Sequence, residues 1–268
     1  PPRSTLFPYT TLFRSGNDTI NGLSGNNDLQ GGADNDTIIS GSGNNAIDGG
    51  TGSDTVDYSY LTGADFGDDT DDVAYYENGV YYSGVKVDLT DSNAQRIHVN
   101  YGTDTITNIE NVIGSTKNDY IVGNDENNIL DGKGGNDYFV LGQGTDTILG
   151  DTGTDTITFT ETGRTAGVIV DLSKNQTYGS LDTYRVINDG FTNTKYLDSV
   201  ENVIGTSLAD TIYGNTDSNS LVGGAGDDTL KGSLGANVLD GGADEDWAYF
   251  DDIVVSGINV TLDTDAIS

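Results

Sequence analysis

A repeat of nine residues runs through most of this chain and constrains its fold more than any other feature. From Gly49 the sequence reads GGTGSDTVD, and steps of nine toward the N-terminus give SGSGNNAID, GGADNDTII, GLSGNNDLQ and FRSGNDTIN. The same frame returns at Gly114 and at Gly205, each time for five blocks. Such a short period indicates a solenoid, in which a repeat buries its apolar side chains only by stacking on its neighbours.

The three arrays lie inside a longer repeat of about 90 to 100 residues. GVKVDL at 84–89 matches GVIVDL at 167–172 and GINVTL at 257–262, while IENVIG and VENVIG end at Gly114 and Gly205. We therefore divide the chain into a foreign or artefactual segment (1–15), a first array (16–57), an insert with a hairpin (58–113), a second array (114–158), an insert (159–204), a third array (205–249) and the truncated start of a next insert (250–268).

The first fifteen residues, PPRSTLFPYTTLFRS, have a different composition from the rest. They contain no Asp, Gly or Asn, but all three Pro of the chain. The stretch resembles the translation of a sequencing adapter, and it lacks the apolar core and cleavage site of a signal peptide. We leave it out of the fold prediction and expect the remainder to be an internal fragment of a longer protein.

Asp dominates the charge of the chain. There are 37 Asp and six Glu against 11 Lys and Arg, so the net charge is −32, and there is one His and no Cys. Binding of nucleic acid through a basic surface is excluded, because no positive charge is available to neutralise phosphates. Disulfide scaffolds and zinc or nucleophile sites built from Cys and His are excluded as well. No apolar run reaches the ~18 residues of a membrane-spanning helix.

Intrinsic disorder is the first alternative to a folded repeat. A net charge of −32 with 34% hydrophobic residues is typical of disordered chains. However, the chain has 38 Gly and 25 Asn, which favour tight turns and positive φ. Its apolar residues are mainly Ile, Leu, Val, Tyr and Phe, which favour strands. We therefore expect many short strands joined by tight turns, in a chain whose charge is hard to tolerate alone.

Each block consists of a turn and a strand. Positions one to six carry Gly, Asn and Asp, and positions seven to nine form a short strand whose position eight points to the core. Strands of three residues are unstable alone, so two blocks form one coil and coils stack at ~4.8 Å. Position eight is apolar throughout: Ile20, Leu29, Ile38, Ile47, Val56; Ile121, Leu130, Phe139, Ile148, Ile157; Ile212, Leu221, Leu230, Leu239 and Ala248.

The blocks resemble the RTX, or haemolysin-type calcium-binding, nonapeptide repeat. GGTGSDTVD at Gly49 and GGAGDDTLK at Gly223 match its pattern Gly-Gly-x-Gly-x-Asp-x-apolar-x in full. The resemblance implies an all-β fold, a right-handed parallel β-roll (a β-solenoid) in three arrays with β-rich inserts. It also implies calcium binding in the turns, export of the unfolded chain by a type I system, and folding outside the cell.

Position six separates the two edges of the predicted roll. Blocks n and n+2 share an edge, and position six alternates between Asp and Asn along the first and third arrays. We predict calcium between successive Asp of one edge, because a hard cation with six to eight oxygen ligands reverses their repulsion. The predicted ligands, about six Ca²⁺ in total, are Asp18, Asp36, Asp54, Asp119, Asp137, Asp155, Asp210, Asp228 and Asp246, with Asp146 as a partial site opposite Asn128 on the Asn edge. We expect the Asn edge to bind calcium weakly or not at all and to be held by amide hydrogen bonds.

The first insert contains two further candidate ligand sites. The acidic stretch DFGDDTDD at 65–72 is either a solvated loop or a cation site, and it lacks EF-hand spacing. YYENGVYY at 75–82 predicts a hairpin with Asn78-Gly79 in the turn. Its four Tyr either cover the side of the roll or stack on a sugar.

Four single residues are given structural roles. Glu110 and Glu201 recur before Asn-Val-Ile-Gly, and we expect them to bind turn amides before the next array starts. Trp247 occupies an outward position seven and is predicted to pack under the following insert. His98 has no partner in the sequence pattern, and we expect it to be exposed or packed.

The sequence offers no catalytic constellation, because carboxylate pairs occur everywhere and specify nothing. We predict that the chain is not an enzyme but a calcium-binding, structural or adhesive segment of a larger secreted or cell-surface protein. Its partners would be calcium ions and a carbohydrate or cell-surface ligand, in an extracellular location. The alternative is an accessory RTX module of a secreted enzyme that degrades polysaccharide or protein, with its catalytic domain outside this fragment.

Overall fold

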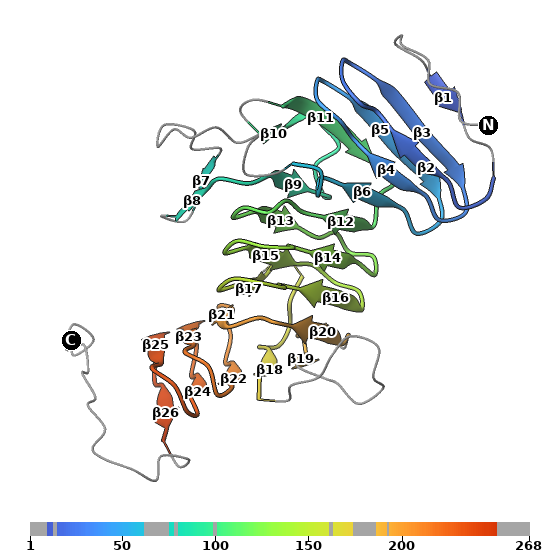
Figure 1. The fold of residues 1–268 in the computed structure, drawn as a ribbon. Coiled ribbons are helices and arrows are strands. Elements are labelled where there is room, and N and C mark those ends of the chain that lie inside the picture. The colour runs from blue at the N-terminus through green and yellow to red at the C-terminus, as the bar shows by residue number, and fades with distance from the viewer. Residues whose placement is uncertain are drawn as a thin grey trace. The chain divides into compact units, whose positions relative to one another are not determined.

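The computed structural model describes residues 10–12, 15–61, 75–77, 80–98, 101–160, 163–173, 186–191 and 193–250. Every regular element in these ranges is a strand, and they contain no helix (Figure 1). It follows that, in the part of the chain described, no helix has the length and hydropathy needed to cross a membrane. The chain divides into two compact units, residues 1–155 and 156–268, and the boundary falls in the last block of the second array.

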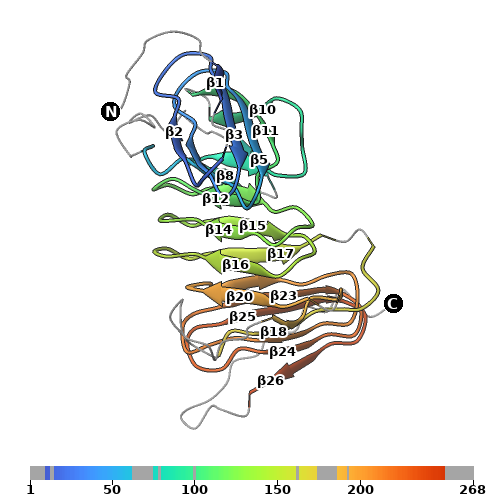
Figure 2. The ribbon, with the colours of Figure 1, turned by 90° about the vertical axis from the view of Figure 1, so that its right-hand side faces the viewer.

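Stacked parallel strands build the first unit (Figures 1 and 2). Its sheets run in the orders β1-β3-β5-β11-β10, β2-β4-β6-β12-β14-β16 and β9-β13-β15, with β7 and β8 as a separate pair. The strands are β1 (Thr10–Leu12), β2 (Thr19–Asn21), β3 (Asp28–Ala33), β4 (Thr37–Ile39), β5 (Ala46–Thr51), β6 (Thr55–Asp57), β7 (Tyr75–Glu77), β8 (Val80–Tyr82), β9 (Lys86–Asp88), β10 (Gln95–His98), β11 (Gly102–Thr107), β12 (Asn111–Ile113), β13 (Tyr120–Val122), β14 (Ile129–Asp131), β15 (Tyr138–Leu141) and β16 (Asp146–Leu149).

Consecutive blocks alternate between two faces of a roll. In the first array, β2, β4 and β6 pair in parallel on one face, while β3 and β5 pair on the other. Each strand is in register with the strand two blocks later, because one coil consists of two nine-residue blocks. This arrangement confirms the predicted β-roll of parallel sheets.

Position eight forms the core, as the alternation of side chains in a strand requires. On one face, successive strands place these residues directly over one another, and all of them are buried. The column in the first unit consists of Ile20, Ile38, Val56, Val112, Leu130 and Ile148.

The end of the first insert continues the roll. Ile106 in β11 lies beside Ile47 in β5, and Val112 in β12 lies beside Val56 in β6. Both residues are buried, so residues 102–113 add a coil between the first and second arrays. The frame is present there as VNYGTDTIT at 99–107, but its turn lacks the Gly-Gly start that marks a regular block.

The segment GVKVDL starts the second array. Its strand β9 pairs in parallel with β13, and Val87 lies in register with Ile121. Between β9 and β11, β10 runs antiparallel to β11. His98 at its end is buried and lies 5.7 Å from the Tyr101 ring, so it is packed.

The predicted hairpin forms, with β7 and β8 paired in antiparallel register. Tyr82 at its end is 1% exposed, and its ring meets the Tyr120 and Tyr138 rings edge-on at 5.3 and 6.0 Å. Tyr82 therefore covers the side of the roll, as one of the two hypotheses predicted. The acidic stretch 65–72 and Asn78-Gly79 lie outside the described residues.

Strand β1 lies in the segment predicted to be foreign. It pairs in parallel with β3, and Thr11 is in register with Leu29. Without β1, the outer edge of β3 would offer unpaired backbone N–H and C=O groups, to which any extended segment can hydrogen bond.

The second unit repeats the same construction. Its sheets run in the orders β20-β19-β18-β22-β24-β26 and β17-β21-β23-β25. Val170 in β18 starts a column that continues through Ile212, Leu230 and Ala248; Ala248, in the last described coil, is exposed. The strands are β17 (Thr156–Phe159), β18 (Ile169–Asp171), β19 (Val186–Asn188), β20 (Lys195–Asp198), β21 (Asn202–Ile204), β22 (Thr211–Tyr213), β23 (Ser220–Ala225), β24 (Thr229–Lys231), β25 (Val238–Ala243) and β26 (Trp247–Tyr249).

Candidate metal sites in the turns

The position-six Asp residues form hydrogen-bonded ladders along one edge of each array. In every step, the backbone N–H of one Asp donates to Oδ1 of the Asp 18 residues later, so the pairs predicted to bind calcium are brought together. The N···O distances are 2.8 Å for 18–36, 2.7 Å for 36–54, 2.8 Å for 119–137, 2.7 Å for 137–155, 2.7 Å for 210–228 and 3.0 Å for 228–246.

The second carboxylate oxygen distinguishes some of these Asp residues from the rest. Oδ2 of Asp36, Asp54, Asp137 and Asp228 is buried and accepts no hydrogen bond. A buried anionic oxygen without a donor costs its full desolvation energy, so such atoms are rare in a completed fold. In their ionised form, these four oxygens have no protein donor that compensates the loss of water.

Backbone carbonyls converge on the same space. A Cβ added to Gly31 would meet Oδ2 of Asp36 and lie 2.5 Å from the carbonyl oxygen of Gly49 in the next coil. The same holds for Gly223, which faces Oδ2 of Asp228 and the carbonyl oxygen of Gly241 at 2.6 Å. Position one is Gly because any side chain would fill this space. A carboxylate and carbonyl oxygens without N–H donors are the ligand set that Ca²⁺ prefers.

The electrostatics of the metal-free turns disfavour the ionised carboxylates. Burial, followed by the charge of Asp119, raises the pKa of Asp137. Burial raises the pKa of Asp54, and it raises the pKa of Asp228 to about 6. A divalent cation in the turn would reverse this effect by favouring the charged form.

The Asn edge is satisfied without a metal. Asn27 donates its backbone N–H to Oδ1 of Asn45 at 3.1 Å, and its Nδ2 donates to the carbonyls of Gly22 and Gly25 at 2.9 and 2.8 Å. Nδ2 of Asn237 likewise donates to two carbonyls of its own turn, at 2.8 and 2.9 Å. An amide NH₂ thus lies among the turn carbonyls, and the expected amide hydrogen bonds are present.

Asp146 lies on this edge, as predicted, and its Oδ1 accepts the backbone N–H of Asn128 at 2.9 Å. Nδ2 of Asn128 donates to the Glu110 carbonyl at 2.7 Å and to Oδ1 of Asn124 at 2.9 Å. Asn128 therefore follows the same rule as the other Asn residues of the edge.

Asp104 is a position-six residue that the repeat analysis missed. Its Oδ2 accepts hydrogen bonds from Oγ of Ser40 at 2.5 Å and from the Tyr58 hydroxyl at 3.0 Å, and its Oδ1 accepts Nδ2 of Asn45 at 2.9 Å. It is 2% exposed, so this network replaces water completely. Asp104 therefore has enough donors to be stable without a cation. The in-frame Asp at position six of VNYGTDTIT was the signal that could have found it.

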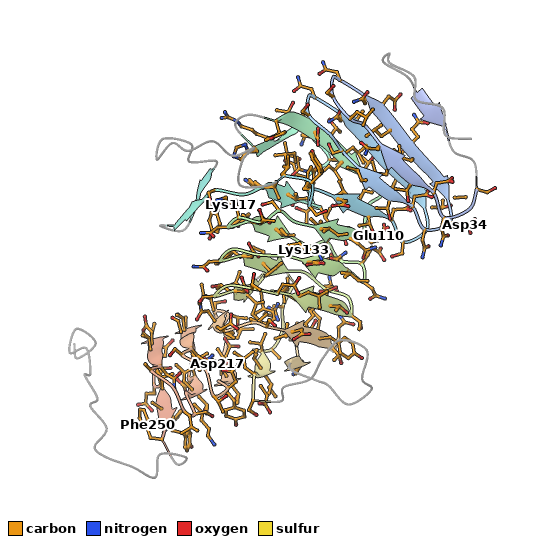
Figure 3. The ribbon with its side chains drawn as sticks, viewed as in Figure 1. Asp34, Glu110, Lys117, Lys133, Asp217 and Phe250 are labelled. Carbon is orange, nitrogen blue, oxygen red and sulfur yellow. The ribbon has the colours of Figure 1, made fainter. Side chains whose placement is uncertain are left out.

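Glu110 ends the first Asp ladder (Figure 3). Its Oε2 accepts the backbone N–H of Asp54 at 2.8 Å, where the next position-six Asp would otherwise lie. Only three residues, 108–110, separate β11 from β12, and the longer Glu side chain spans the shorter turn. Glu110 thus binds a turn amide before the second array starts, as predicted, and this amide belongs to the last Asp of the first array. Glu201 hydrogen bonds to Asn219 through its backbone carbonyl, at 2.8 Å.

No group of three or more His, Asp or Glu side chains gathers as a metal cluster anywhere in the described ranges. A cation in the turns would therefore be held by two carboxylates and by backbone carbonyls. This mixture suits calcium, which accepts both kinds of oxygen in flexible geometry.

The stacked coils and their oxygen-lined turns define a calcium-binding β-roll. The family model of the RTX calcium-binding nonapeptide repeat, which describes four copies, matches residues 14–47, 21–56, 107–139, 122–157, 204–239 and 223–252. These segments cover just over half of the chain, which therefore belongs to the RTX calcium-binding nonapeptide repeat family. No curated protein matches the chain. The chain is thus a calcium-binding repeat region, and the repeats of its family are structural and not catalytic.

Proposed function

We propose that this chain is a calcium-dependent β-roll of a larger secreted or cell-surface protein, in which it serves as a structural or adhesive segment. The supporting observation is the buried Oδ2 of Asp36, Asp54, Asp137 and Asp228, which accepts no hydrogen bond. In water these oxygens are solvated, so folding without a cation would leave them uncompensated.

The proposed ligands are carboxylates of adjacent coils together with the carbonyls of their turns. They come from the pairs Asp36 with Asp54, Asp137 with Asp155, and Asp228 with Asp246. Calcium, when bound, supplies the positive charge that holds two like charges together one coil apart. The Asp residues also link the coils through Oδ1, so binding and folding involve the same side chain.

The magnitudes favour an extracellular location. Extracellular calcium modules have dissociation constants of ~10⁻⁴–10⁻³ M. With ~2 mM calcium and a dissociation constant of ~10⁻⁴ M, each ion stabilises the fold by about 1.8 kcal/mol. A few such ions supply much of the ~5–15 kcal/mol by which a domain is stable. Cytosolic calcium would leave the sites empty, which supports export of an unfolded chain and folding outside the cell.

A calcium titration of the whole chain, followed by far-UV circular dichroism, tests this function. We expect a cooperative transition from coil to β-structure with calcium and no transition with magnesium at the same concentration. Asp36→Ala and Asp137→Ala should each raise the calcium midpoint. A chain that is already rich in β-structure in chelator, and does not respond to calcium, would show that the Asp edge is not a folding switch.

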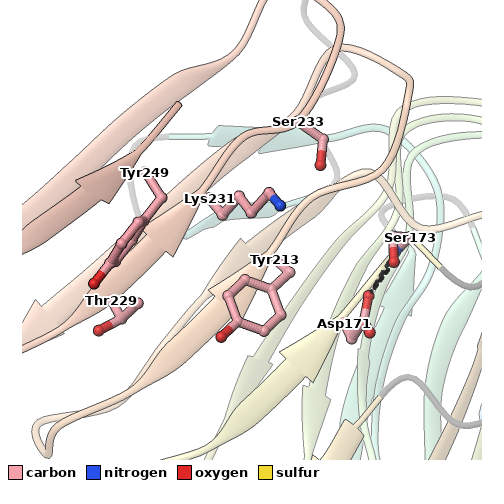
Figure 4. A pocket seen from close by; sticks show the side chains of 7 residues that line it. All are labelled: Asp171, Ser173, Tyr213, Thr229, Lys231, Ser233 and Tyr249. Carbon is pink, nitrogen blue, oxygen red and sulfur yellow. Dashed lines mark hydrogen bonds between the residues drawn. The ribbon is translucent and has the colours of Figure 1, made fainter. Parts of the chain in front are cut away.

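A pocket in the second unit favours carbohydrate binding as a second candidate function. It has a volume of about 400 Å³ and is lined by Asp171, Ser173, Tyr213, Thr229, Lys231, Ser233 and Tyr249 (Figure 4). Tyr213, Lys231 and Tyr249 lie side by side in the register of β22, β24 and β26, so the Lys lies between two rings. Aromatic faces beside charged and hydroxyl groups are a typical combination for stacking and hydrogen bonding to sugars.

Calorimetric titration of the calcium-loaded chain with neutral and acidic oligosaccharides tests this second function. Tyr213→Ala should weaken binding about tenfold, the equivalent of about 1.4 kcal/mol of stacking. The control is Leu234→Ala, which removes an exposed apolar side chain that does not line the pocket. Equal weakening by both variants, or no binding by the unaltered chain, would count against an adhesive role at this site.

A further inference from the structure

The first Asp of the second array is bound by protein donors on both carboxylate oxygens. Oδ1 of Asp119 accepts the backbone N–H of Val85 at 2.6 Å and Oγ of Ser115 at 2.7 Å. Oδ2 accepts the backbone N–H of Ser115 at 2.6 Å. Asp119 is 0% exposed, so these three hydrogen bonds replace its hydration.

The first Asp of the third array repeats this arrangement in the other unit. Oδ1 of Asp210 accepts the backbone N–H of Val168 at 2.6 Å and Oγ1 of Thr206 at 3.0 Å. Oδ2 accepts the backbone N–H of Thr206 at 2.5 Å. Val85 and Val168 occupy the same place in GVKVDL and GVIVDL, so in both modules the insert supplies one donor to the first carboxylate.

Backbone conformation at position two explains why later Asp residues lack these donors. Gly32, Gly50 and Gly224 have φ of 114°, 103° and 123°, and the Asp four residues after each has a buried Oδ2 without a hydrogen bond. Lys133 (Figure 3) also has a positive φ, 69°, and Asp137, four residues later, again has a buried Oδ2 without a hydrogen bond. The ammonium of Lys133 pairs with a different carboxylate, since its Nζ lies 2.6 Å from Oδ2 of Asp131.

Where position two lacks a positive φ, its backbone N–H donates a hydrogen bond to the position-six side chain of the same turn. Ser115 and Thr206 are not among the positive-φ residues, and the backbone N–H of each donates to its own position-six carboxylate. Asn124 and Asn215 share this conformation and donate to Oδ1 of Asn128 and Asn219, at 2.9 and 3.0 Å. The handedness of position two therefore decides whether the turn presents an N–H donor or an open space to its position-six side chain.

We propose that Asp119 and Asp210 are metal-free caps that start their arrays, and that calcium binds only in the turns whose position two has a positive φ. This inference rests on the proposed calcium-binding function and changes its number of sites. The pairs that begin with Asp119 and Asp210 are therefore removed, which leaves Asp137 with Asp155 in the second array and Asp228 with Asp246 in the third. In the first array, Asp36 with Asp54 fits the rule, because Gly32 and Gly50 both have a positive φ. Residue 14, at position two of the turn that contains Asp18, lies outside the described residues. A cation at Asp119 would have to displace a backbone N–H and leave it buried without an acceptor.

The two caps also give the second and third arrays a fixed starting point. A solenoid coil gains stability only from its neighbours, so the first coil of an array lacks support on one side. The strand of GVKVDL or GVIVDL supplies that support, and its hydrogen bond to the first Asp needs no calcium. The inserts are therefore the metal-independent starts from which the calcium-loaded coils extend.

Counting bound calcium in the full chain tests this inference. We would compare Asp119→Asn with Asp137→Asn, and Asp210→Asn with Asp228→Asn, by equilibrium dialysis at saturating calcium. Asp137→Asn and Asp228→Asn should each lose one ion. Asp119→Asn and Asp210→Asn should bind as many ions as the unaltered chain.

A milder variant covers the case in which a replaced cap prevents folding. Ser115→Ala removes one donor and keeps the carboxylate, so the calcium count at saturation should stay unchanged while the calcium midpoint of folding rises. Loss of an ion in Ser115→Ala or in Asp119→Asn would overturn the inference and leave the proposed function intact. Absence of calcium uptake by the unaltered chain would overturn both.

Discussion

The backbone N–H of Asp36 donates a 2.7 Å hydrogen bond to Oδ1 of Asp54, one coil further along the chain. The other oxygen of Asp54, Oδ2, is buried and accepts no hydrogen bond. One carboxylate thus links two coils and also leaves an acceptor for a cation. In the proposed calcium-bound state, stability and ion binding would therefore be coupled through a single side chain.

Replacing the Asp residues that we propose as calcium ligands by Asn should make the roll independent of calcium. Oδ1 of Asn can still accept the N–H of the preceding coil, and Nδ2 can donate to the turn carbonyls, as in Asn27 and Asn237. The variant changes Asp36, Asp54, Asp137, Asp155, Asp228 and Asp246 together. We expect β-structure in chelator by circular dichroism.

The matched control for this variant carries Ala at the same six positions. Ala removes the charge but also the hydrogen bond between coils, so this chain should stay unfolded in chelator. If the Asn variant is as unfolded in chelator as the unaltered chain, the comparison between the two edges is wrong.

Acidification should fold the metal-free chain. Burial raises the pKa of Asp137, and it raises the pKa of Asp228 to about 6. A carboxyl whose pKa is higher in the folded than in the unfolded state binds its proton more tightly when folded, so protonation favours the fold. This contribution is complete below the unfolded pKa of ~3.9, and it is lost as the pH rises through the folded pKa. We therefore expect the β-content of calcium-depleted protein to increase between about pH 8 and about pH 4.

Asp137→Asn should weaken this pH dependence, because an amide does not titrate. Circular dichroism across the pH range, with calcium removed by resin, measures both chains. A metal-free chain that becomes less structured as the pH falls from 8 toward 5 would contradict the predicted sign.

Truncation of a position-eight side chain should destabilise the calcium-loaded roll strongly. Phe139 is 0% exposed, so Phe139→Ala should cost about 3–5 kcal/mol in the free energy of unfolding. Ile129 occupies position seven and is 39% exposed, so Ile129→Ala should cost less than about 1 kcal/mol. Urea denaturation in excess calcium compares the two, and equal losses would mean that position eight is not the core position.

The Tyr58 hydroxyl should stabilise the first coil added by the insert. It donates to Oδ2 of the buried Asp104 at 3.0 Å, and Tyr58→Phe leaves this buried carboxyl with one hydrogen-bond donor fewer. We expect a loss of about 1.5–3 kcal/mol in the free energy of unfolding, with the number of bound calcium ions unchanged. The control is Tyr213→Phe, at a partly exposed site, which should have little effect in the same urea titration. A change in calcium number would show that Asp104 binds metal.

Several properties of the roll follow from the nine-residue period alone. Alternation in the short strands places position eight in the core, and Ile20, Ile38 and Val56 are stacked and buried accordingly. Two blocks per coil separate position six into two edges, so Asp36 lies beside Asp54 and Asn27 beside Asn45. These contacts are repeated at a fixed offset of 18 residues, which is why the sequence was sufficient to predict them.

The supply of hydrogen-bond donors at each carboxylate depends on segments outside the nine-residue repeat. Asp104 meets Ser40 across 64 residues, and Asp119 meets Val85 across 34. The nine-residue frame does not encode these contacts, because they depend on how the inserts return to the roll.

Asp119 and Asp137 occupy the same position of the repeat and differ only in their surroundings. Oδ2 of Asp119 accepts a hydrogen bond from the Ser115 backbone N–H. Oδ2 of Asp137 accepts none, and Lys133, four residues before Asp137, has a left-handed backbone conformation with a positive φ. The sequence by itself identified the carboxylates that line one edge. Only the tertiary structure decided which of them are already compensated, because compensation depends on backbone handedness and on donors brought in from distant strands.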